Sequence, residues 1–296
     1  MEVHGDAGRE WLDTLTITLK DVCKRWNLKI EAPFERLSYN FVAAAIRADN
    51  SKVVLKAGVP CHELTSEMDA LRCYDGVGTV KLLEADETAG VMLLERVLPG
   101  HTLLELLKGR NPGWVIPDVA EVMRKIRRPP PPEHRFKSVA DWAKGFERLR
   151  QTFGGGTGPF PTATVEMAEG IYKDFLADPG EQVLLHGDLH HENILESRER
   201  GYLVIDPKGI VGEAAYEVGA FLRNPMPWIM DTANFNYFHA CRMCQLADEL
   251  ELDRKRVRDW TVAQAVLSAW WSYEDHGAGW EPMIRFAQLF SRIHVR

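Results

Sequence analysis

The chain has 296 residues, of which 45% are hydrophobic and 27% are charged, and its formal net charge is −7 at pH 7. This composition suits one large core or two lobes that share a cleft, and it excludes a disordered chain because charged and apolar residues are interspersed. A negative balance also argues against nucleic acid as a principal partner, since phosphate binding requires an excess of Lys and Arg.

The cysteines and the absence of targeting signals bear on the compartment. There are five cysteines, an odd number with uneven spacing, and the sequence has no signal-peptide pattern and no long apolar run. These features favour a reducing compartment, so we expect a cytoplasmic protein with no membrane partner. Cys241 and Cys244 form a C-x-x-C without a second pair, and the favoured interpretation is two half-buried thiols one helical turn apart.

The first hundred residues predict a helix followed by a small sheet that a second helix interrupts. Apolar spacing predicts the two helices, and alternation of apolar and polar residues predicts the strands. The expected helices cover 9–26 and Cys61–Tyr74, and the expected strand pairs are Phe41–Lys56, which turns at Asp49-Asn50-Ser51, and Thr79–Ala85 with Gly90–Val97.

After Pro99-Gly100, helical spacing dominates to the end of the chain. The exceptions are three short apolar segments that predict strands, at Val183–Leu185, Asn193–Leu195 and Leu203–Ile205. The basic run Arg124–Arg128 is typical of a solvated helix end, and a helix is also expected over Phe235–Glu251. Two connectors are expected, an extended one at Pro129–Pro132 and a flexible one at Gly154–Gly158 between two helices.

The segment His186–Leu195 carries the strongest chemical signal. It matches the catalytic-loop pattern H-R-D-L-x-x-x-N, with Gly in place of Arg. In that pattern the Asp accepts the proton of the attacking hydroxyl, and the Asn five residues later ligates Mg²⁺. These roles fall on Asp188 and Asn193.

A second motif follows at Leu203–Gly209, where an apolar strand ends in Asp206. Asp206 stands where the kinase pattern D-F-G places a second metal ligand, although Pro-Lys-Gly replaces Phe-Gly. Phosphoryl transfer needs oxygen ligands that converge on a hard cation, and two short strands on either side of 196–201 would bring Asn193 and Asp206 together.

Upstream, Val53-Val54-Leu55-Lys56 resembles V-A-I-K, in which the Lys reaches the α- and β-phosphates of ATP and pairs with a Glu on the next helix. We expect Glu67 to be that partner. Glu63 lies one turn earlier on the same helix face and is the alternative. Without the downstream motifs, Lys56 would be taken for a strand-end lysine on the surface.

Together these residues resemble the aminoglycoside and hydroxyurea phosphotransferases, the group that includes the streptomycin 6-kinases. The combination of H-G-D-L-H-x-x-N-I-L with I-D-P-K-G is quite specific. The similar stretches cover most of the chain except its last seventy residues and are Leu37–Lys56, Glu67–Gly76, Leu93–Leu104, Pro129–Trp142, Leu184–Leu195 and Val204–Pro225.

The resemblance implies an α+β, bilobal, protein-kinase-like fold with a small N-lobe built on an antiparallel sheet and a larger, mostly helical C-lobe. The implied boundaries are a nucleotide-binding lobe at 1–95, a hinge at 96–102 and a helical lobe at 103–296 with the catalytic loop and the acceptor pocket. The backbone of Glu95-Arg96-Val97 would meet adenine. The implied reaction phosphorylates a hydroxyl of a small molecule, an aminoglycoside such as streptomycin or hydroxyurea, with ATP and Mg²⁺.

Two departures from the kinase patterns concern loops. The glycine-rich G-x-G-x-x-G is absent from Leu37–Phe41, so Ser38, Asn40 and backbone N–H groups would have to cover the phosphates. Glu217 stands where the family more often carries an Asp that ties down the catalytic loop. We expect Glu217 to perform the same task with one extra methylene.

The acceptor site is the least defined part of the sequence. Glu213, Glu274 and Asp275 could form a negative pocket for a cationic acceptor, and a solvated acidic face is the equal alternative. Tryptophans near the C-terminus could form a stacking floor, but helix core is the commoner role; these are Trp260, Trp270, Trp271 and Trp280.

Two other functions compete with the kinase interpretation. One is a metal-dependent hydrolase whose ligands would be His186, His190, His191 and Glu192. That function leaves the spacing of Asp188, Asn193 and Asp206 unexplained. The other is a catalytically silent, ligand-binding pseudokinase. It is disfavoured because the chain has all four residues that a kinase needs, Lys56, Asp188, Asn193 and Asp206. The sequence does not indicate an oligomeric state.

Overall fold

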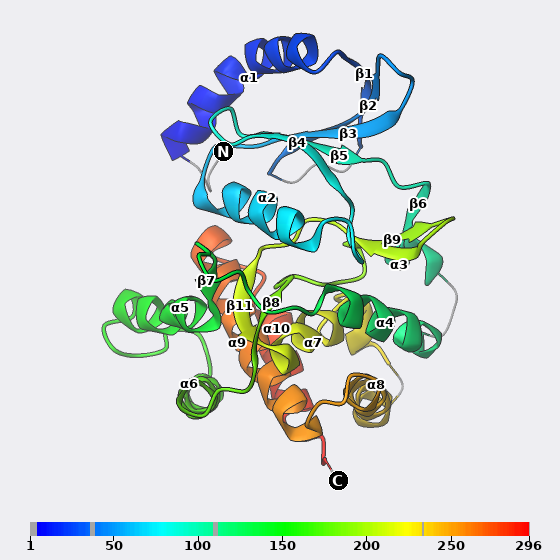
Figure 1. Ribbon diagram of the computed structural model, residues 1–296. Coiled ribbons are helices and arrows are strands. Elements are labelled where there is room, and N and C mark those ends of the chain that lie inside the picture. The colour runs from blue at the N-terminus through cyan, green and yellow to red at the C-terminus, as the bar shows by residue number, and fades with distance from the viewer. Residues whose placement is uncertain (1–4, 36–38, 109–111, 233, 296) are drawn as a thin grey trace.

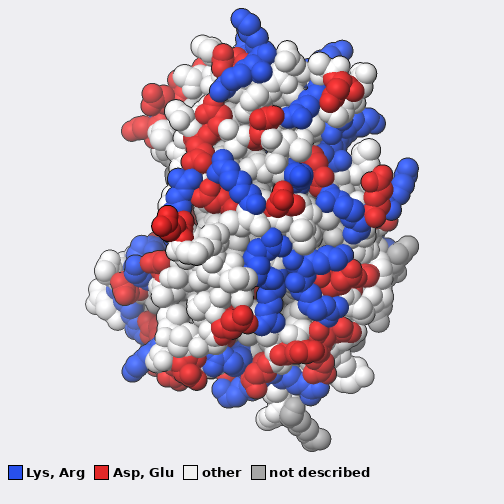
Figure 2. All heavy atoms as spheres, in the orientation of Figure 1, with Lys and Arg blue, Asp and Glu red and all other residues white. Residues whose placement is uncertain are grey.

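The computed structural model describes residues 5–35, 39–108, 112–232 and 234–295. The chain forms a small part built around one sheet and a larger part made mostly of helices, which lie one above the other in Figure 1. On the face drawn in Figure 2, Lys and Arg side chains are interspersed with Asp and Glu. No helix among the described residues has both the length and the apolar character needed to cross a membrane.

The small part contains a five-stranded antiparallel sheet in the order β1-β2-β3-β5-β4. The strands are β1 (Leu28–Pro33), β2 (Phe41–Arg47), β3 (Lys52–Ala57), β4 (Leu82–Asp86) and β5 (Val91–Glu95). Two helices pack on this sheet, α1 (Gly5–Arg25) and α2 (His62–Tyr74). In Figure 1 they lie on opposite faces of it.

Alternation along the central strands explains this layering. Val53 and Leu55 of β3 face the cluster that includes α1, whereas Val54 between them packs on the cluster that includes α2. Successive side chains of a strand point to opposite faces, so a strand that is apolar on both sides must be covered on both sides. Lys56 follows in the same strand and is nevertheless 2% exposed.

Two three-stranded sheets connect the parts. One has the order β10-β9-β6 and the other β7-β11-β8. Their strands are β6 (Pro99–Thr102), β7 (Lys137–Ser138), β8 (Gln182–Leu185), β9 (Ile194–Ser197), β10 (Gly201–Val204) and β11 (Ile210–Glu213). Gly100 in β6 has a φ of +78°, and a Cβ there would lie 2.8 Å from the carbonyl oxygen of Val97, so only glycine fits this turn after the small sheet.

The larger part packs its helices around a continuous apolar core to which Trp260, Trp270 and Phe221 contribute. The α-helices are α3 (Leu103–Leu106), α4 (Ile116–Ile126), α5 (Val139–Thr152), α6 (Thr162–Ala177), α7 (Ala214–Leu222), α8 (Phe235–Glu249), α9 (Arg254–His276) and α10 (Glu281–Phe290), and the short 3₁₀ helices are η1 (Pro112–Val115) and η2 (Trp228–Met230). Ser138 caps α5 in a capping box with Asp141, and Asp253 caps α9.

The predicted elements agree with the structure, with four omissions. The expected helices and strand pairs are all present, and the glycine run joins α5 to α6 as a loop. The basic run at 124–128 ends α4, as expected. The strands β1, β6, β7 and β11 were not predicted; β6, β7 and β11 are short and pair with strands far along the chain, whereas β1 pairs with the next strand, β2.

Candidate active site

The catalytic loop links the two small sheets, because it begins after β8 and ends where β9 starts. Glu217 of α7 anchors the beginning of this loop from behind. Its carboxylate accepts hydrogen bonds from the backbone N–H of His186 at 2.5 Å and of Gly187 at 3.0 Å. Burial raises the pKa of Glu217 to about 7, although both backbone donors oppose the rise. The expectation that Glu217 ties down the loop is therefore met in the structure.

His186 holds the loop against the strand that carries Asp206. Its Nε2 lies 2.8 Å from the carbonyl oxygen of Ile205, and its Nδ1 lies 3.2 Å from the backbone N of Asp188. Burial lowers the pKa of His186 to about 4, so the ring is neutral. A neutral ring that donates from Nε2 and accepts at Nδ1 satisfies both contacts and fixes the backbone on either side of the loop.

Asn193 and Asp206 are neighbours because β9 and β10 are paired. The backbone N–H of Ile205 donates to the carbonyl oxygen of Asn193 at 3.0 Å, so the next residue, Asp206, leaves its strand beside Asn193. Asn193 Nδ2 donates to the carbonyl oxygen of Asp188 at 2.9 Å. Asp206 has a φ of +59°, an uncommon backbone conformation for a non-glycine residue that is enriched at functional positions.

Lys56 connects the small sheet to the rest of the site. Its Nζ donates to both carboxylate oxygens of Glu67, at 2.7 and 2.8 Å, and to Asp206 Oδ1 at 3.0 Å. Burial alone would lower the pKa of Lys56, but the two carboxylates outweigh it and raise that pKa above its ordinary value. Burial likewise acts to raise the pKa of Asp206, yet the Lys56 ammonium holds it below the usual range.

Glu67 is therefore the partner of Lys56, and the alternative residue Glu63 pairs with Lys208. Burial raises the pKa of Glu67, and Lys56 opposes this rise. Because Nζ donates to both oxygens of Glu67, we assign the Lys56–Glu67 pair as ionised.

The oxygen groups of Asn193 and Asp206 fit a divalent cation. An amide oxygen and a carboxylate are hard ligands of the kind that Mg²⁺ prefers, and the Asp206 side chain is 46% exposed, so a ligand can reach it. The alternative site at the histidines does not form. Among the residues that the structure describes, no three His, Cys, Asp or Glu side chains are placed to hold a metal ion.

The individual histidines show why that alternative fails. Both nitrogens of His186 are already engaged by the backbone, and His191 is 1% exposed and stacks on Phe221 with ring centroids 4.2 Å apart. Only His190 faces the site, where its Nε2 lies 3.7 Å from Asp188 Oδ2. A zinc site needs several imidazoles or carboxylates around one point, and these rings diverge.

The expected nucleotide residues lie at both ends of the central strands, with Asn40 near the end of β3 that carries Lys56 and Glu95 opposite Val53 at its start. Asn40 lies opposite Gly58, just beyond the strand end that carries Lys56, and a Cβ on Gly58 would lie 2.2 Å from Asn40 Oδ1. Glu95 ends β5, and its side chain forms an ion pair with Arg200. Val97 follows in the connection to β6. Ser38 lies outside the described residues.

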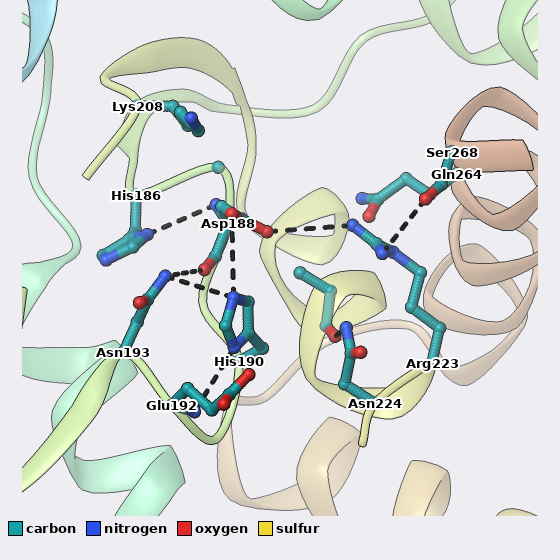
Figure 3. A network of polar contacts seen from close by, with 12 residues as sticks. His186, Asp188, His190, Glu192, Asn193, Lys208, Arg223, Asn224, Gln264 and Ser268 are labelled. Carbon is teal, nitrogen blue, oxygen red and sulfur yellow. Dashed lines mark hydrogen bonds and ion pairs between the residues drawn. The ribbon is translucent and has the colours of Figure 1, made fainter. Parts of the chain in front are cut away.

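Asp188 has an unexpected cationic neighbour, which Figure 3 shows. The guanidinium of Arg223, at the end of α7, approaches Asp188 Oδ1 to 3.9 Å and donates to Ser268 Oγ of α9 at 3.3 Å. Lys208 lies near the loop on another side, with its backbone N–H bonded to the carbonyl oxygen of His186 at 2.7 Å. Neither residue was predicted. Lys208 belongs to a quoted motif, but no sequence pattern distinguishes Arg223.

The expectation for Glu213 is wrong. Strand register pairs Glu213 with Gln182, at the end of β8 that is remote from the catalytic loop. Its carboxylate is 7% exposed and accepts from Arg256 Nε at 3.1 Å and from the backbone N–H of Gly180 at 3.1 Å. Glu213 is thus a neutralised, structural carboxylate, and its closeness to Asp206 in sequence does not place it at the acceptor site.

The other two acidic candidates lie at the end of α9. Both oxygens of Glu274 accept from Arg148, at 2.6 and 2.9 Å, so its charge is already offset. Asp275 is exposed, and its negative charge helps to raise the pKa of the same arginine, Arg148. A contact of Asp275 with an acceptor stays a prediction. Of the tryptophans, Trp260 and Trp270 are 1% exposed core residues, as the commoner role predicts.

Two aromatic rings do lie beside the catalytic loop. A Cβ on Gly187 would lie 3.1 Å from the Trp142 ring, and Trp142 packs edge-on against Trp271 with ring centroids 5.2 Å apart. Trp271 is half-buried, so this pair borders the site on the side of α5 and α9.

Comparisons with known proteins agree with this geometry. A sequence model described as aminoglycoside/hydroxyurea antibiotic resistance kinase matches residues 25–276. The chain is 30% identical over 287 residues to a hydroxyurea phosphotransferase of Kitasatospora aureofaciens, covering 92% of this chain and 77% of that protein. It is 27% identical over 282 residues to a streptomycin 6-kinase of Streptomyces griseus, covering 92% and 87%.

Solved structures share the fold at low sequence identity. The crystal structure of aminoglycoside phosphotransferase APH(4)-Ia is similar with a TM-score of 0.65 at 16% identity, covering 95% of this chain and 98% of that one. Choline kinase LicA from Streptococcus pneumoniae gives a TM-score of 0.65 at 13% identity, covering 94% and 99%. The expected α+β, kinase-like fold is thereby confirmed.

Proposed function

The chain belongs to the aminoglycoside/hydroxyurea antibiotic resistance kinase family, and from this premise we propose that it transfers the γ-phosphate of ATP to a hydroxyl of a small molecule, with Asp188 as the base. The observation that carries the proposal is the chain of contacts from Glu67 through Lys56 to Asp206. It joins the small sheet to Asp206, 150 residues later, and the backbone N–H of Ile205 joins Asp206 to Asn193 at the end of the loop that bears Asp188.

In the proposed reaction the acceptor hydroxyl gives its proton to the Asp188 carboxylate, and its oxygen forms a bond to the γ-phosphorus. The bond from that phosphorus to the bridging oxygen breaks, and its electron pair leaves with ADP. Asp188 suits this task because its side chain is 32% exposed and the loop around it is held by Glu217 and His186. A fixed loop keeps the base in position for attack.

Charge on the phosphates would be met by Lys56 and by the oxygen ligands. Glu67 holds the Lys56 ammonium in one place, from which Nζ would contact the α- and β-phosphates. Asn193 and Asp206 would hold Mg²⁺, which neutralises developing charge on the β- and γ-oxygens when bound. The same two residues are joined through the backbone of Ile205, which fixes their separation.

Nucleotide contacts would come mainly from the part of the chain before residue 96. We assign adenine to the backbone of Glu95 and Val97, and cover of the phosphates to Asn40 and Ser38. In this assignment residues 1–95 form the nucleotide-binding lobe, 96–102 the hinge, and 103–296 the lobe that binds the acceptor.

The acceptor class follows from the relatives' names, which are streptomycin 6-kinase and hydroxyurea phosphotransferase. We therefore propose an aminoglycoside such as streptomycin, or hydroxyurea, as the molecule that is phosphorylated. Asp275 is the remaining candidate for contact with a cationic acceptor, since the Glu213 and Glu274 carboxylates are paired with arginines.

The test is an acceptor panel. Purified protein is incubated with ATP, Mg²⁺ and one compound at a time, ADP release is followed, and the product is identified by mass spectrometry as a gain of one phosphate. The proposal expects acceptor-dependent ADP release with streptomycin, a related aminocyclitol or hydroxyurea. ATP binding without transfer to any hydroxyl compound would instead identify a ligand-binding pseudokinase.

A further inference from the structure

Arg223 is a buried cation whose donors are only partly satisfied by the described residues. Its side chain is 11% exposed, yet among the described residues its hydrogen bonds amount to one, from Nη1 to Ser268 Oγ at 3.3 Å. Its Nε is buried without a hydrogen-bond partner among those residues. The 3.9 Å between Nη2 and Asp188 Oδ1 is too long for a hydrogen bond. A guanidinium has five N–H donors, and leaving donors unpaired in a buried setting costs free energy, so a ligand that accepts from the Nη groups would be favoured.

The position of Arg223 places these donors on the acceptor side of Asp188. It follows α7 directly and reaches toward Ser268 of α9, whereas Asn193 lies on the opposite side of Asp188 in Figure 3. Asp206, which accepts from Lys56, is joined to Asn193 by the bond from the backbone N–H of Ile205, so the proposed metal and nucleotide groups belong to the Asn193 side. A ligand atom on Arg223 would therefore belong to the acceptor.

The neighbouring side chains from α7 and α9 are neutral and engaged. Asn224 Nδ2 donates to the carbonyl oxygen of Ala220 at 2.9 Å, and Gln264 donates to the carbonyl oxygen of Tyr216. Arg242 adds a second positive charge at the end of α7. It donates to backbone carbonyl oxygens there, and neutral carbonyls do not cancel its charge. The acceptor side of Asp188 thus presents a guanidinium where the amines of a polycation would require carboxylates.

We propose that Arg223 is a specificity-determining residue that binds a carbonyl oxygen next to the phosphorylated hydroxyl, so that the acceptor is a neutral hydroxamate-type compound. This inference rests on the proposed function. A hydroxamate or N-hydroxyurea group has a hydroxyl and a carbonyl oxygen separated by two atoms, so one oxygen can face Asp188 while the other accepts from the guanidinium. Hydrogen bonds from a charged donor to a neutral acceptor are worth more than those between neutral groups, and they orient the hydroxyl. A polycationic aminoglycoside would meet repulsion at the same point.

The test compares two acceptors that share an N–OH group. Acetohydroxamic acid carries the adjacent carbonyl, and N-ethylhydroxylamine lacks it; hydroxyurea and streptomycin complete the panel. The intact protein should favour acetohydroxamic acid over N-ethylhydroxylamine by about tenfold or more in kcat/KM. Arg223→Gln should lower kcat/KM for acetohydroxamic acid by about 10- to 100-fold and reduce the ratio between the two compounds toward one, with KM for ATP unchanged.

Further variants separate recognition from folding. Arg223→Lys keeps the positive charge but loses the planar set of guanidinium donors, so it should retain part of the preference for acetohydroxamic acid. Ser268→Ala removes the hydroxyl that orients the guanidinium and should lower the preference by about two- to tenfold in a folded protein. Arg127→Gln, which breaks only an exposed pair with Glu181, is the control and should leave the ratio unchanged.

Each outcome decides the inference. An unchanged ratio in both Arg223→Gln and Ser268→Ala would overturn it while the phosphotransferase assignment stands. Transfer to streptomycin without transfer to either hydroxamate would do the same. If the intact protein phosphorylates no compound of the panel, the proposed function fails and this inference fails with it.

Discussion

Replacing Glu217 by alanine removes both acceptors that hold the start of the catalytic loop. The backbone N–H groups of His186 and Gly187, at 2.5 and 3.0 Å from the carboxylate, would be left unpaired, and both residues are buried. At about 1–3 kcal/mol for each unpaired buried donor, the gross loss is about 2–6 kcal/mol in the free energy of unfolding. Turnover should fall as well, because Asp188 follows immediately and would lose its fixed position.

The size of this loss should depend on pH. Burial raises the pKa of Glu217 to about 7 in the folded protein, against an ordinary value near 4.5, so the folded state binds the proton more tightly than the unfolded state. For such a group the stabilising contribution is present at low pH and disappears as pH rises through the folded-state pKa. Relative to the fully deprotonated carboxylate, proton binding at Glu217 adds about 2 kcal/mol to the free energy of unfolding at pH 5.5 and almost nothing at pH 8.

The assay is urea denaturation followed by tryptophan fluorescence at both pH values, with the slope m checked for each variant. Glu217→Ala should be destabilised at both pH values, and by about 2 kcal/mol more at pH 5.5 than at pH 8. Glu181→Ala removes a carboxylate that is 72% exposed and is the matched control, expected to stay within about 0.5 kcal/mol of the intact protein. The reasoning is refuted if the two variants behave alike at both pH values.

Three further substitutions test separate parts of the site. Asp206→Ala should abolish the response of turnover to added Mg²⁺, because it removes the carboxylate proposed to hold the ion; an unchanged Mg²⁺ titration would argue against that role. Glu67→Gln breaks the buried pair with Lys56, so KM for ATP should rise about tenfold and stability should fall by on the order of 3 kcal/mol, whereas an unaltered KM would separate Lys56 from the nucleotide. For any cationic acceptor that the intact protein phosphorylates, Asp275→Asn should raise KM about two- to fivefold at low salt and have little effect at high salt; no change at low salt would remove Asp275 from the acceptor site.

The residues proposed for the nucleotide and metal sites could be singled out from the sequence because most of them stand in short motifs. The catalytic-loop spacing gave Asp188 and Asn193, and the strand-end Asp206 followed from the same kinase pattern. The pairing of Lys56 with Glu67 rather than Glu63 also agreed with the structure. Such motifs are local, since most of their geometry is fixed within one strand and the turn after it.

The acceptor side could not be predicted in the same way. Glu213 seemed close to the site because it lies only seven positions after Asp206, but β11 runs away from the loop and places Glu213 beside Arg256, 43 residues later. Arg223 carries no motif, and its approach to Asp188 depends on how α7 packs on α9. These contacts arise from long-range packing, which a pattern of neighbouring residues does not record.

The unpredicted strands have a similar cause. Leu28 and Ile30 of β1 do alternate with polar residues, but the segment is six residues long and follows a helix directly. β6 begins at Pro99-Gly100, which indicates a break, and it is a strand only because β9 lies beside it. The alternation in β1 was a usable signal, whereas β6 offered none.

The most direct test of the account is the turnover of Asp188→Asn with an acceptor that the intact protein phosphorylates. The amide keeps the shape of the side chain and cannot accept the hydroxyl proton, and positioned general-base catalysis is worth about 10²–10⁴ in rate. We predict a fall in kcat of that size with ATP binding retained, and no change in Asp178→Asn, whose side chain is 95% exposed. Retained turnover in Asp188→Asn would contradict the assignment of Asp188 as the base.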